Sequence, residues 1–207
     1  LLRVDCGWEI WEEDSLLPIM QIGELPLRNC ISYRNGPNCD CLLSCFDANK
    51  KLVFIEHNGK IVFRAIIRLT KGSFVAADER KTIEFVDVTA KSKSRENKAE
   101  ELVLFLERYY QSGLNEQEIQ KAVNLTVMLV REKAEKLRAR VVLSRRYKNV
   151  LENKNYVLTN FYIYISASKN GSQYLDSLGG EASVSASGSY TCNTFLLEAE
   201  ERREESL

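Results

Sequence analysis

Histidine is almost absent from this chain of 207 residues, in which His57 is the only one. A centre built from several histidines is therefore excluded. Only 3 prolines and 10 glycines occur, which argues against long linkers and low-complexity segments. The 29 basic and 29 acidic side chains cancel, so the overall charge does not attract nucleic acid, and only a local basic patch could do so.

Long apolar runs are missing as well. No stretch approaches the 18 residues of a membrane-spanning helix, and we expect no membrane partner. The composition, 44% hydrophobic and 28% charged, is that of an ordinary soluble domain. The sequence begins with Leu1 rather than methionine and shows no signal-peptide pattern, so we expect a piece excised from a longer cytoplasmic protein.

Four of the six cysteines fall within sixteen positions: Cys30, Cys39, Cys41 and Cys45. A closed tetrahedral zinc site takes four thiolates, and a loop rich in Asn, Gly and Pro can bring them together. The spacing differs from the paired Cys-x2-Cys knuckle, and the run from Cys41 to Cys45 also suits the start of a buried apolar segment. We therefore expect buried, reduced thiols and no zinc, with a zinc site on these four cysteines as the alternative.

A nucleophilic cysteine is a further hypothesis for this cluster. A thiol needs a base or a positive field to become a thiolate at neutral pH. His57 would supply that base only if the segment around it folded back over the cysteines, and a histidine beside Asn-Gly is more simply explained as an exposed turn residue.

The clearest local pattern is a hairpin. Residues 51–56 and 61–70 are rich in β-branched and aromatic residues, and His57-Asn58-Gly59-Lys60 separates them. Asn-Gly tolerates the positive φ angles of a tight turn, so we predict two antiparallel strands. Alternation would place Val53 and Ile55 on one face and Leu52 and Phe54 on the other. On the second strand, odd-numbered residues from 61 to 67 would face one side and even-numbered residues from 62 to 68 the other.

The best helix runs from Asn115 to Arg138. Asn115 and Glu118 have the spacing of a capping box, and apolar residues recur at helical spacing from Ile119 to Leu137. Residues 101–110 suit either a helix or a buried strand. The remaining expectations are a strand and a short helix within residues 1–29, an irregular loop over 30–50, strands at 82–88, 140–144, 156–165 and 189–198, and a short helix over 168–178.

This order of elements resembles the GNAT superfamily of N-acyltransferases. In that family a strand leads through a tight glycine-bearing loop into a helix, and backbone N–H groups there hold the pyrophosphate of acyl-CoA. Here residues 102–110 would be the strand, 110–115 the loop and 115–138 the helix. The stretch from Tyr174 to Gly180 looks like the aromatic-Tyr-x-x-Leu-Gly-aromatic stretch near the end of that fold.

The resemblance implies an α/β (α+β) fold with a mostly antiparallel mixed sheet flanked by helices. Residues 51–199 would form the GNAT-like domain, residues 1–50 an irregular cysteine-bearing segment packed on it, and residues 200–207 a charged tail. The activity implied is transfer of an acyl group from acyl-CoA to an amine of a small molecule or a protein.

The resemblance also implies site residues. Gly113, Leu114 and Asn115 would bind the pyrophosphate of acyl-CoA through their backbone N–H groups. Glu107 would act as the base that takes a proton from the amine through water, and Tyr174 as the acid that protonates the departing thiolate. Each of the two side chains has a plainer reading: Glu107 as an ordinary charge at a strand end, and Tyr174 as core packing.

The alternative function belongs to another class: a non-catalytic module that binds protein or nucleic acid within a larger protein of a mobile or defence element. Of the family pattern Arg/Gln-x-x-Gly-x-Gly/Ala, the loop keeps only Gly113. Residues 131–148 carry eight basic and two acidic side chains, densest at Arg145, Arg146 and Lys148, which could contact phosphates or simply form a solvated surface. An acyltransferase needs an open cleft between residues 102–110 and 140–144, whereas side chains can fill that gap in a binding module.

Overall fold

The hairpin at Asn58-Gly59 lies in the middle of the fold. In the computed structural model, strand β3 (Lys50–His57) pairs antiparallel with β4 (Lys60–Phe74), and the φ angles of Asn58 and Gly59 are 53° and 77°. Val53 and Ile55 belong to one hydrophobic cluster, whereas Leu52 and Phe54 belong to the cluster on the opposite face. The predicted hairpin is confirmed, including the faces of its first strand.

The second strand departs from strict alternation at one place. The pairing shifts by one residue between Ile55, which lies opposite Phe63, and the next residue, which lies opposite Ile61. Val62 is therefore the extra residue of a β-bulge, which turns the neighbouring side chains to the other face. Ile61 packs with the cluster of Phe54, and Val62 with the opposite cluster, so the prediction for these two residues is wrong. From Phe63 onward the alternation is as predicted.

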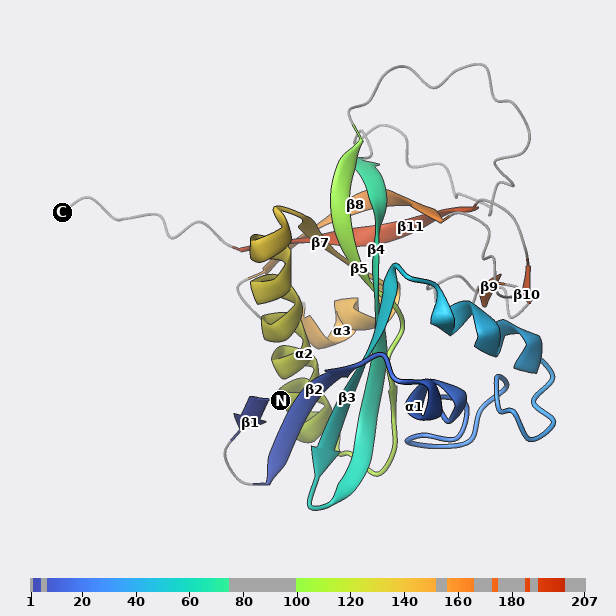
Figure 1. Ribbon diagram of the computed structural model, residues 1–207. Helices are drawn as coiled ribbons and strands as arrows, with labels where there is room; N and C mark the ends of the chain where they lie inside the picture. The colour runs from blue at the N-terminus through green and yellow to red at the C-terminus, as the bar shows by residue number, and fades with distance from the viewer. Residues whose placement is uncertain are drawn as a thin grey trace.

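The structure describes residues 2–4, 7–74, 100–151, 156–165, 173–174, 185–186 and 190–199. The remaining strands of the main sheet are β1 (Leu2–Val4), β2 (Trp8–Glu13), β5 (Glu101–Leu106), β6 (Tyr110–Gln111), β7 (Arg140–Leu143), β8 (Tyr156–Ile165) and β11 (Tyr190–Ala199). Their order is β1-β2-β3-β4-β5-β7-β11-β8, with β6 beside β4 (Figure 1). Among these described strands the pairing is antiparallel throughout except between β5 and β7.

The long strand β4 changes partners along one edge. β3 lies beside it as far as Arg68, and β8 takes the same edge from Lys71 to Phe74, while β5 lies along the other edge. The strands β4, β5, β7, β11 and β8 therefore follow one another around a ring of paired strands. The predicted strands at 140–144, 156–165 and 189–198 are confirmed, and the one at 82–88 lies outside the described residues.

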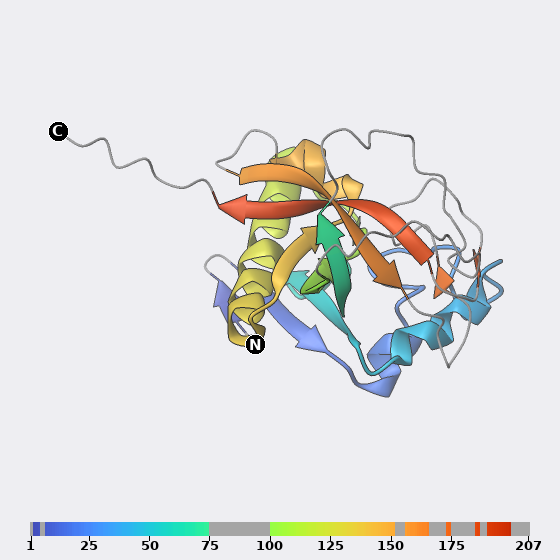
Figure 2. The ribbon, with the colours of Figure 1, turned by 90° about the horizontal axis from the view of Figure 1, so that it is seen from above.

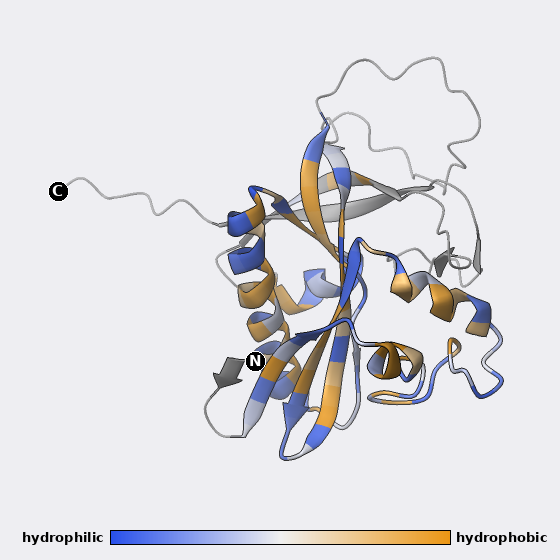
Figure 3. Ribbon diagram, viewed as in Figure 1, coloured by the Kyte–Doolittle hydropathy of each residue, from blue (hydrophilic) through white to orange (hydrophobic). Residues whose placement is uncertain are grey.

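Helices cover both faces of the sheet (Figure 2). Helix α2 (Glu116–Leu137) lies on one face and buries one side of itself, from Ala122 to Ala134, against the cluster that contains Val53. Its N-cap is Asn115, its C-cap is Arg138, and the predicted capping box is present. Hydrophobic and hydrophilic residues alternate along α2, as Figure 3 shows. The predicted fold class, a mixed and mostly antiparallel sheet flanked by helices, is confirmed.

Helix α1 (Leu16–Met20) and the 3-10 helix η1 (Cys39–Phe46) pack on the other face. The predicted strand and short helix within residues 1–29 are confirmed as β2 and α1. The loop predicted over 30–50 is wrong for η1, because this stretch lacks Gly and Pro and buries Cys41, Leu42 and Cys45 on one side. Since β2 pairs with β3, the first 50 residues also contribute a strand to the main sheet.

Two small helices, η2 (Arg145–Tyr147) and α3 (Lys148–Leu151), follow β7. The short helix predicted over 168–178 is wrong at Gln173–Tyr174, which form strand β9 and pair with β10 (Ser185–Ala186); the rest of that range lies outside the described residues. In the parts of the chain listed above, no helix is long and apolar enough to cross a membrane.

Candidate functional site

The pairing of the parallel strands β5 and β7 ends at the position where the resemblance places acyl-CoA. They pair from Val103 opposite Arg140 to Leu106 opposite Leu143. The N–H of Ser144 still donates to the carbonyl of Leu106 at 3.0 Å, and β7 then ends. The next residue of the β5 chain, Glu107, turns its N–H to the carbonyl of Ile66 on β4 at 2.9 Å. The hydrogen-bonded ladder between β5 and β7 therefore ends at Leu106 and Ser144, whereas the contact of the β5 chain with β4 continues to Glu107.

Tyr147 connects the two chains directly beyond the end of this ladder. It belongs to η2, immediately after β7, and its side chain is completely buried. Its hydroxyl donates to the carbonyl oxygen of Glu107 at 3.0 Å, and its ring packs edge-on against Tyr109 with centroids 5.1 Å apart. Burial raises the pKa of Tyr147 well above 10, so the hydroxyl keeps the proton that it donates. Where an acyltransferase needs an open cleft, this chain has a buried aromatic side chain.

The loop before α2 carries the three residues predicted to bind pyrophosphate. Gly113 has a φ of 73°, as a tight turn requires. The N–H of Leu114 donates to Oε1 of Gln111 at 3.3 Å. The N–H of Asn115 donates to Oε2 of Glu118 at 2.9 Å, and the N–H of Glu118 to Oδ1 of Asn115 at 3.0 Å. Side chains of the protein therefore already accept from two of the three proposed donors.

The charge at this end of α2 is negative. Glu116 and Glu118 both lie in the first turn, where a carboxylate interacts favourably with the helix dipole and repels a phosphate. Gly113 and Asn115 are exposed, whereas Glu107 is buried in the interior. The pyrophosphate-binding role of Gly113, Leu114 and Asn115 stays a prediction.

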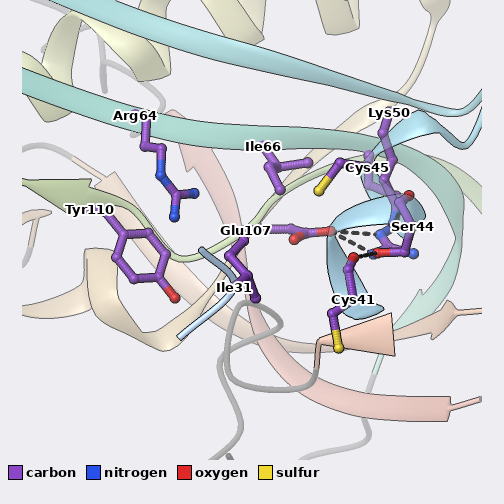
Figure 4. Close-up of a pocket in the computed structure, with 10 residues that line it drawn as sticks. Ile31, Cys41, Ser44, Cys45, Lys50, Arg64, Ile66, Glu107 and Tyr110 are labelled. Atoms are coloured by element: carbon purple, nitrogen blue, oxygen red, sulfur yellow. Dashed lines mark hydrogen bonds and ion pairs between the residues drawn. The ribbon is translucent and has the colours of Figure 1, made fainter. Parts of the chain in front are cut away.

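Glu107 is held by a buried ion pair. Its carboxylate is 1% exposed, and Oε1 accepts from both Nε and Nη2 of Arg68, at 2.8 and 2.6 Å. Arg68 is itself only 3% exposed. The carboxylate points towards Cys45 and Ser44 of η1, as Figure 4 shows. Its role as a catalytic base stays a prediction, since the structure shows it bound to a cation inside the protein.

Arg68 and Glu107 line a pocket together with two further cations, Lys50 and Arg64, which fix the N-terminal segment to the sheet. Nζ of Lys50 donates to the carbonyl of Ser44 at 2.6 Å and lies 3.5 Å from the carboxylate of Asp47. Burial, and then the charge of Arg68, lower the pKa of Lys50. Nε of Arg64 donates to the carbonyl of Leu25 at 2.8 Å.

The pocket is closed. The guanidinium of Arg64 covers the ring of Tyr110 with its carbon 4.0 Å from the centroid, and Ile31, Cys41 and Cys45 approach from the N-terminal segment. The cavity that remains is about 10 Å³, which is room for about one water molecule. An acyl acceptor does not fit here without movement of the N-terminal segment.

The cysteines differ in exposure. Cys41 and Cys45 are buried, as predicted, and Cys30 is half-buried. Cys39, the first residue of η1, is exposed, so the prediction of burial is wrong for Cys39. All four are free thiols in the structure. In the described ranges, no three or more His, Cys, Asp or Glu side chains lie together as a metal site needs. Zinc binding by these four cysteines stays untested.

We expect alkylation to follow this difference. Burial raises the pKa of Cys45, so its thiol is both inaccessible and protonated at neutral pH. Iodoacetamide at pH 7.5 should modify Cys39 in the native protein, and should modify Cys41 and Cys45 only after unfolding. Peptide mapping by mass spectrometry measures each site separately. Modification of Cys45 as fast as that of Cys39 in the folded protein would contradict the burial described here.

Other predicted residues lie apart from this site. The ring of His57 stacks on Trp8, with centroids 4.4 Å apart. His57 ends β3, whereas Lys50 beside η1 begins it, and the seven steps of strand from one to the other span about 23 Å. His57 is therefore too far from Cys45 to act as its base. Tyr174 lies in β9, and its side chain is outside the described part of the structure.

Three cations of the basic region are paired with acidic side chains. Lys133 contacts Glu12 at 2.5 Å, Lys136 contacts Glu132 at 2.6 Å, and Arg140 pairs with Glu101. Arg145 and Arg146 of η2 and Lys148 of α3 are exposed. The region is thus a charged surface in which several of the cations have partners within the chain.

Comparisons with family models, with curated proteins and with solved structures gave no match. The description of the site therefore rests on the geometry of this chain alone. Sequence reasoning missed the two residues that determine it, Arg68 and Tyr147. The available signal for Arg68 was its position, with Arg64, on one face of a stretch from Ile61 to Leu69 that is otherwise apolar. Arginines there must either face solvent or find buried partners.

Proposed function

We propose that this chain is a GNAT-like domain that does not transfer acyl groups and works as a binding module. The observation that carries the proposal is the position of Tyr147, which is fully buried and whose hydroxyl binds the carbonyl of Glu107 between β5 and β7. That carbonyl and the space beside it are where an open cleft would have to lie.

The GNAT-like part of the proposal is supported by the course of the chain. Strand β5 leads through a loop with Gly113 at positive φ into the capped helix α2, and β7 follows beside β5 in parallel. These are the elements, in the order, that the resemblance assigns to the acyl-CoA site. The pairing of β5 with β7 also ends, at Leu106 and Leu143, where that site would need it to end.

The non-catalytic part is supported by three contacts. The hydroxyl of Tyr147 binds the carbonyl of Glu107, and the N–H of Asn115 already donates to Glu118 in the capping box. Arg68 holds the carboxylate of Glu107 in the interior. Large apolar side chains are also exposed on the described surface, among them Leu16 and Leu17, each at 66%, and Met128 at 64%. Exposed apolar side chains that form a contiguous patch are typical of surfaces that bind other macromolecules.

Isothermal titration calorimetry with acetyl-CoA tests the proposal. We expect no heat beyond that of dilution at ligand concentrations up to about 1 mM, which corresponds to a binding free energy weaker than about −4 kcal/mol. A parallel assay follows loss of acetyl-CoA thioester in the presence of a mixture of primary amines, and we expect no turnover. Saturable binding with a Kd below about 100 µM, or any transfer that depends on the protein, would refute the non-catalytic function.

A further inference from the structure

The outward face of α2 is apolar at its centre. Met128 lies near the middle of the 22-residue helix and is 64% exposed. Leu125 and Leu129 beside it are half-buried. These residues line a surface groove of about 340 Å³ together with Ile10 of β2 and three charged residues of the helix, Arg131, Glu132 and Glu135. A flexible, exposed methionine in such a groove is typical of a contact surface.

One pair of opposite charges on this face lies symmetrically about Met128. Lys121, Met128 and Glu135 are seven residues apart, which is two turns, so they lie on one line along the helix. Lys121 and Glu135 therefore lie at equal distances of about 10 Å from Met128, on opposite sides, with opposite charges. The flanking positions bring no like charges together, because residues 132 and 131 lie level with the uncharged Asn124 and Leu125 of an antiparallel partner.

We propose that this face binds a second copy of the chain, with the two α2 helices antiparallel and a two-fold axis at Met128. An antiparallel helix turned about Met128 places Lys121 of one protomer opposite Glu135 of its partner, and the symmetry makes this contact twice. The two Met128 side chains meet at the axis between these ion pairs. The seven-residue spacing is also the repeat at which two helices stay in contact along their length.

The side chains that this dimer needs are placed for it. Glu135 is exposed. Nζ of Lys121 lies 5.0 Å from the centre of the Trp8 ring, at the edge of the same face. The buried side of α2 is used by the core, so the Met128 face is the side left for a partner. The inference rests on α2 and does not depend on whether the domain binds acyl-CoA, so the two proposals fail independently.

Sedimentation velocity from about 5 to 500 µM tests the dimer. We expect the wild-type chain to shift with concentration from 23.7 kDa towards twice that mass. Met128→Glu places two carboxylates at the axis and should weaken the dimer at least tenfold. Leu16→Glu on α1 is the matched control, because Leu16 is 66% exposed and lies outside this face; it should leave the dimer unchanged. Circular dichroism confirms that each variant is folded.

A charge exchange tests the antiparallel register. Lys121→Glu alone brings two pairs of carboxylates together, and Glu135→Lys alone brings two pairs of ammonium groups together, so each variant should be monomeric where the wild type is dimeric. An equimolar mixture of the two variants restores both ion pairs and should dimerise again. A wild-type monomer at 500 µM, a dimer indifferent to Met128→Glu, or a mixture that stays monomeric would each overturn the proposal.

Discussion

Replacing Arg68 by methionine should lower the free energy of unfolding by about 3–5 kcal/mol, since the carboxylate of Glu107 then stays buried without the guanidinium that pairs with it. Both partners are at most 3% exposed, so water cannot take the place of the missing cation. Urea unfolding followed by the fluorescence of Trp8 and Trp11 measures the change. The double variant Arg68→Met with Glu107→Leu should recover most of the loss, because no buried charge of this pair remains.

An exposed ion pair provides the matched control. Lys71 and Glu100 lie 3.2 Å apart with side chains 67% and 50% exposed. Lys71→Met should change the free energy of unfolding by less than about 1 kcal/mol, since water screens such a pair. If Arg68→Met cost no more than Lys71→Met, the buried ion pair would not stabilise the protein as described. A double variant less stable than Arg68→Met would also contradict the argument.

Tyr147 should be nearly as important for stability. Tyr147→Ala removes a fully buried ring between β5, β7 and Tyr109 and should cost about 3–5 kcal/mol. Tyr147→Phe keeps the ring and removes only the hydrogen bond to Glu107, so it should cost about 1 kcal/mol. Equal losses of unfolding free energy in the two variants would show that packing of the Tyr147 ring does not stabilise the protein.

The hydroxyl also predicts a pH dependence. Burial raises the pKa of Tyr147 in the folded protein above its unfolded value near 10. Such a group contributes its stability fully below pH 10 and loses it as the pH rises through 10 towards the raised pKa. Urea unfolding from pH 8 to 11 should therefore show a steeper fall in the wild type than in Tyr147→Phe. The variant Tyr33→Phe, at a 44% exposed tyrosine, should follow the wild-type curve.

Local signals in the sequence predict much of the fold. Asn58-Gly59 requires only the φ angles of two residues, and the capping box of α2 requires only Asn115 and Glu118, so both can be recognised without the rest of the chain. The bulge at Val62 could not be predicted, because it is a feature of the pairing with β3 rather than of β4 alone. The helix expected at 168–178 failed at Gln173–Tyr174, where pairing with β10 determines the structure instead of local propensity.

The candidate site is harder to predict because its contacts join distant residues. Arg68 and Glu107 are 39 positions apart, and Tyr147 and Glu107 are 40 apart. Arg68 faces the interior because η1 covers that face of the sheet. The sequence of β4 alone does not show that η1 packs there. The resemblance identified Glu107 as a candidate site residue. Its ion pair with Arg68 and its hydrogen bond with Tyr147 follow only from the three-dimensional arrangement.

The central claim is that Tyr147 closes the place where acyl-CoA would bind, and a crystal structure determined with several millimolar acetyl-CoA in the drop tests it most directly. The account predicts the Tyr147 hydroxyl within hydrogen-bonding distance of the Glu107 carbonyl and no ligand between β5 and β7. A pantetheine chain between these strands, with the Tyr147 ring turned out of the gap, would contradict it.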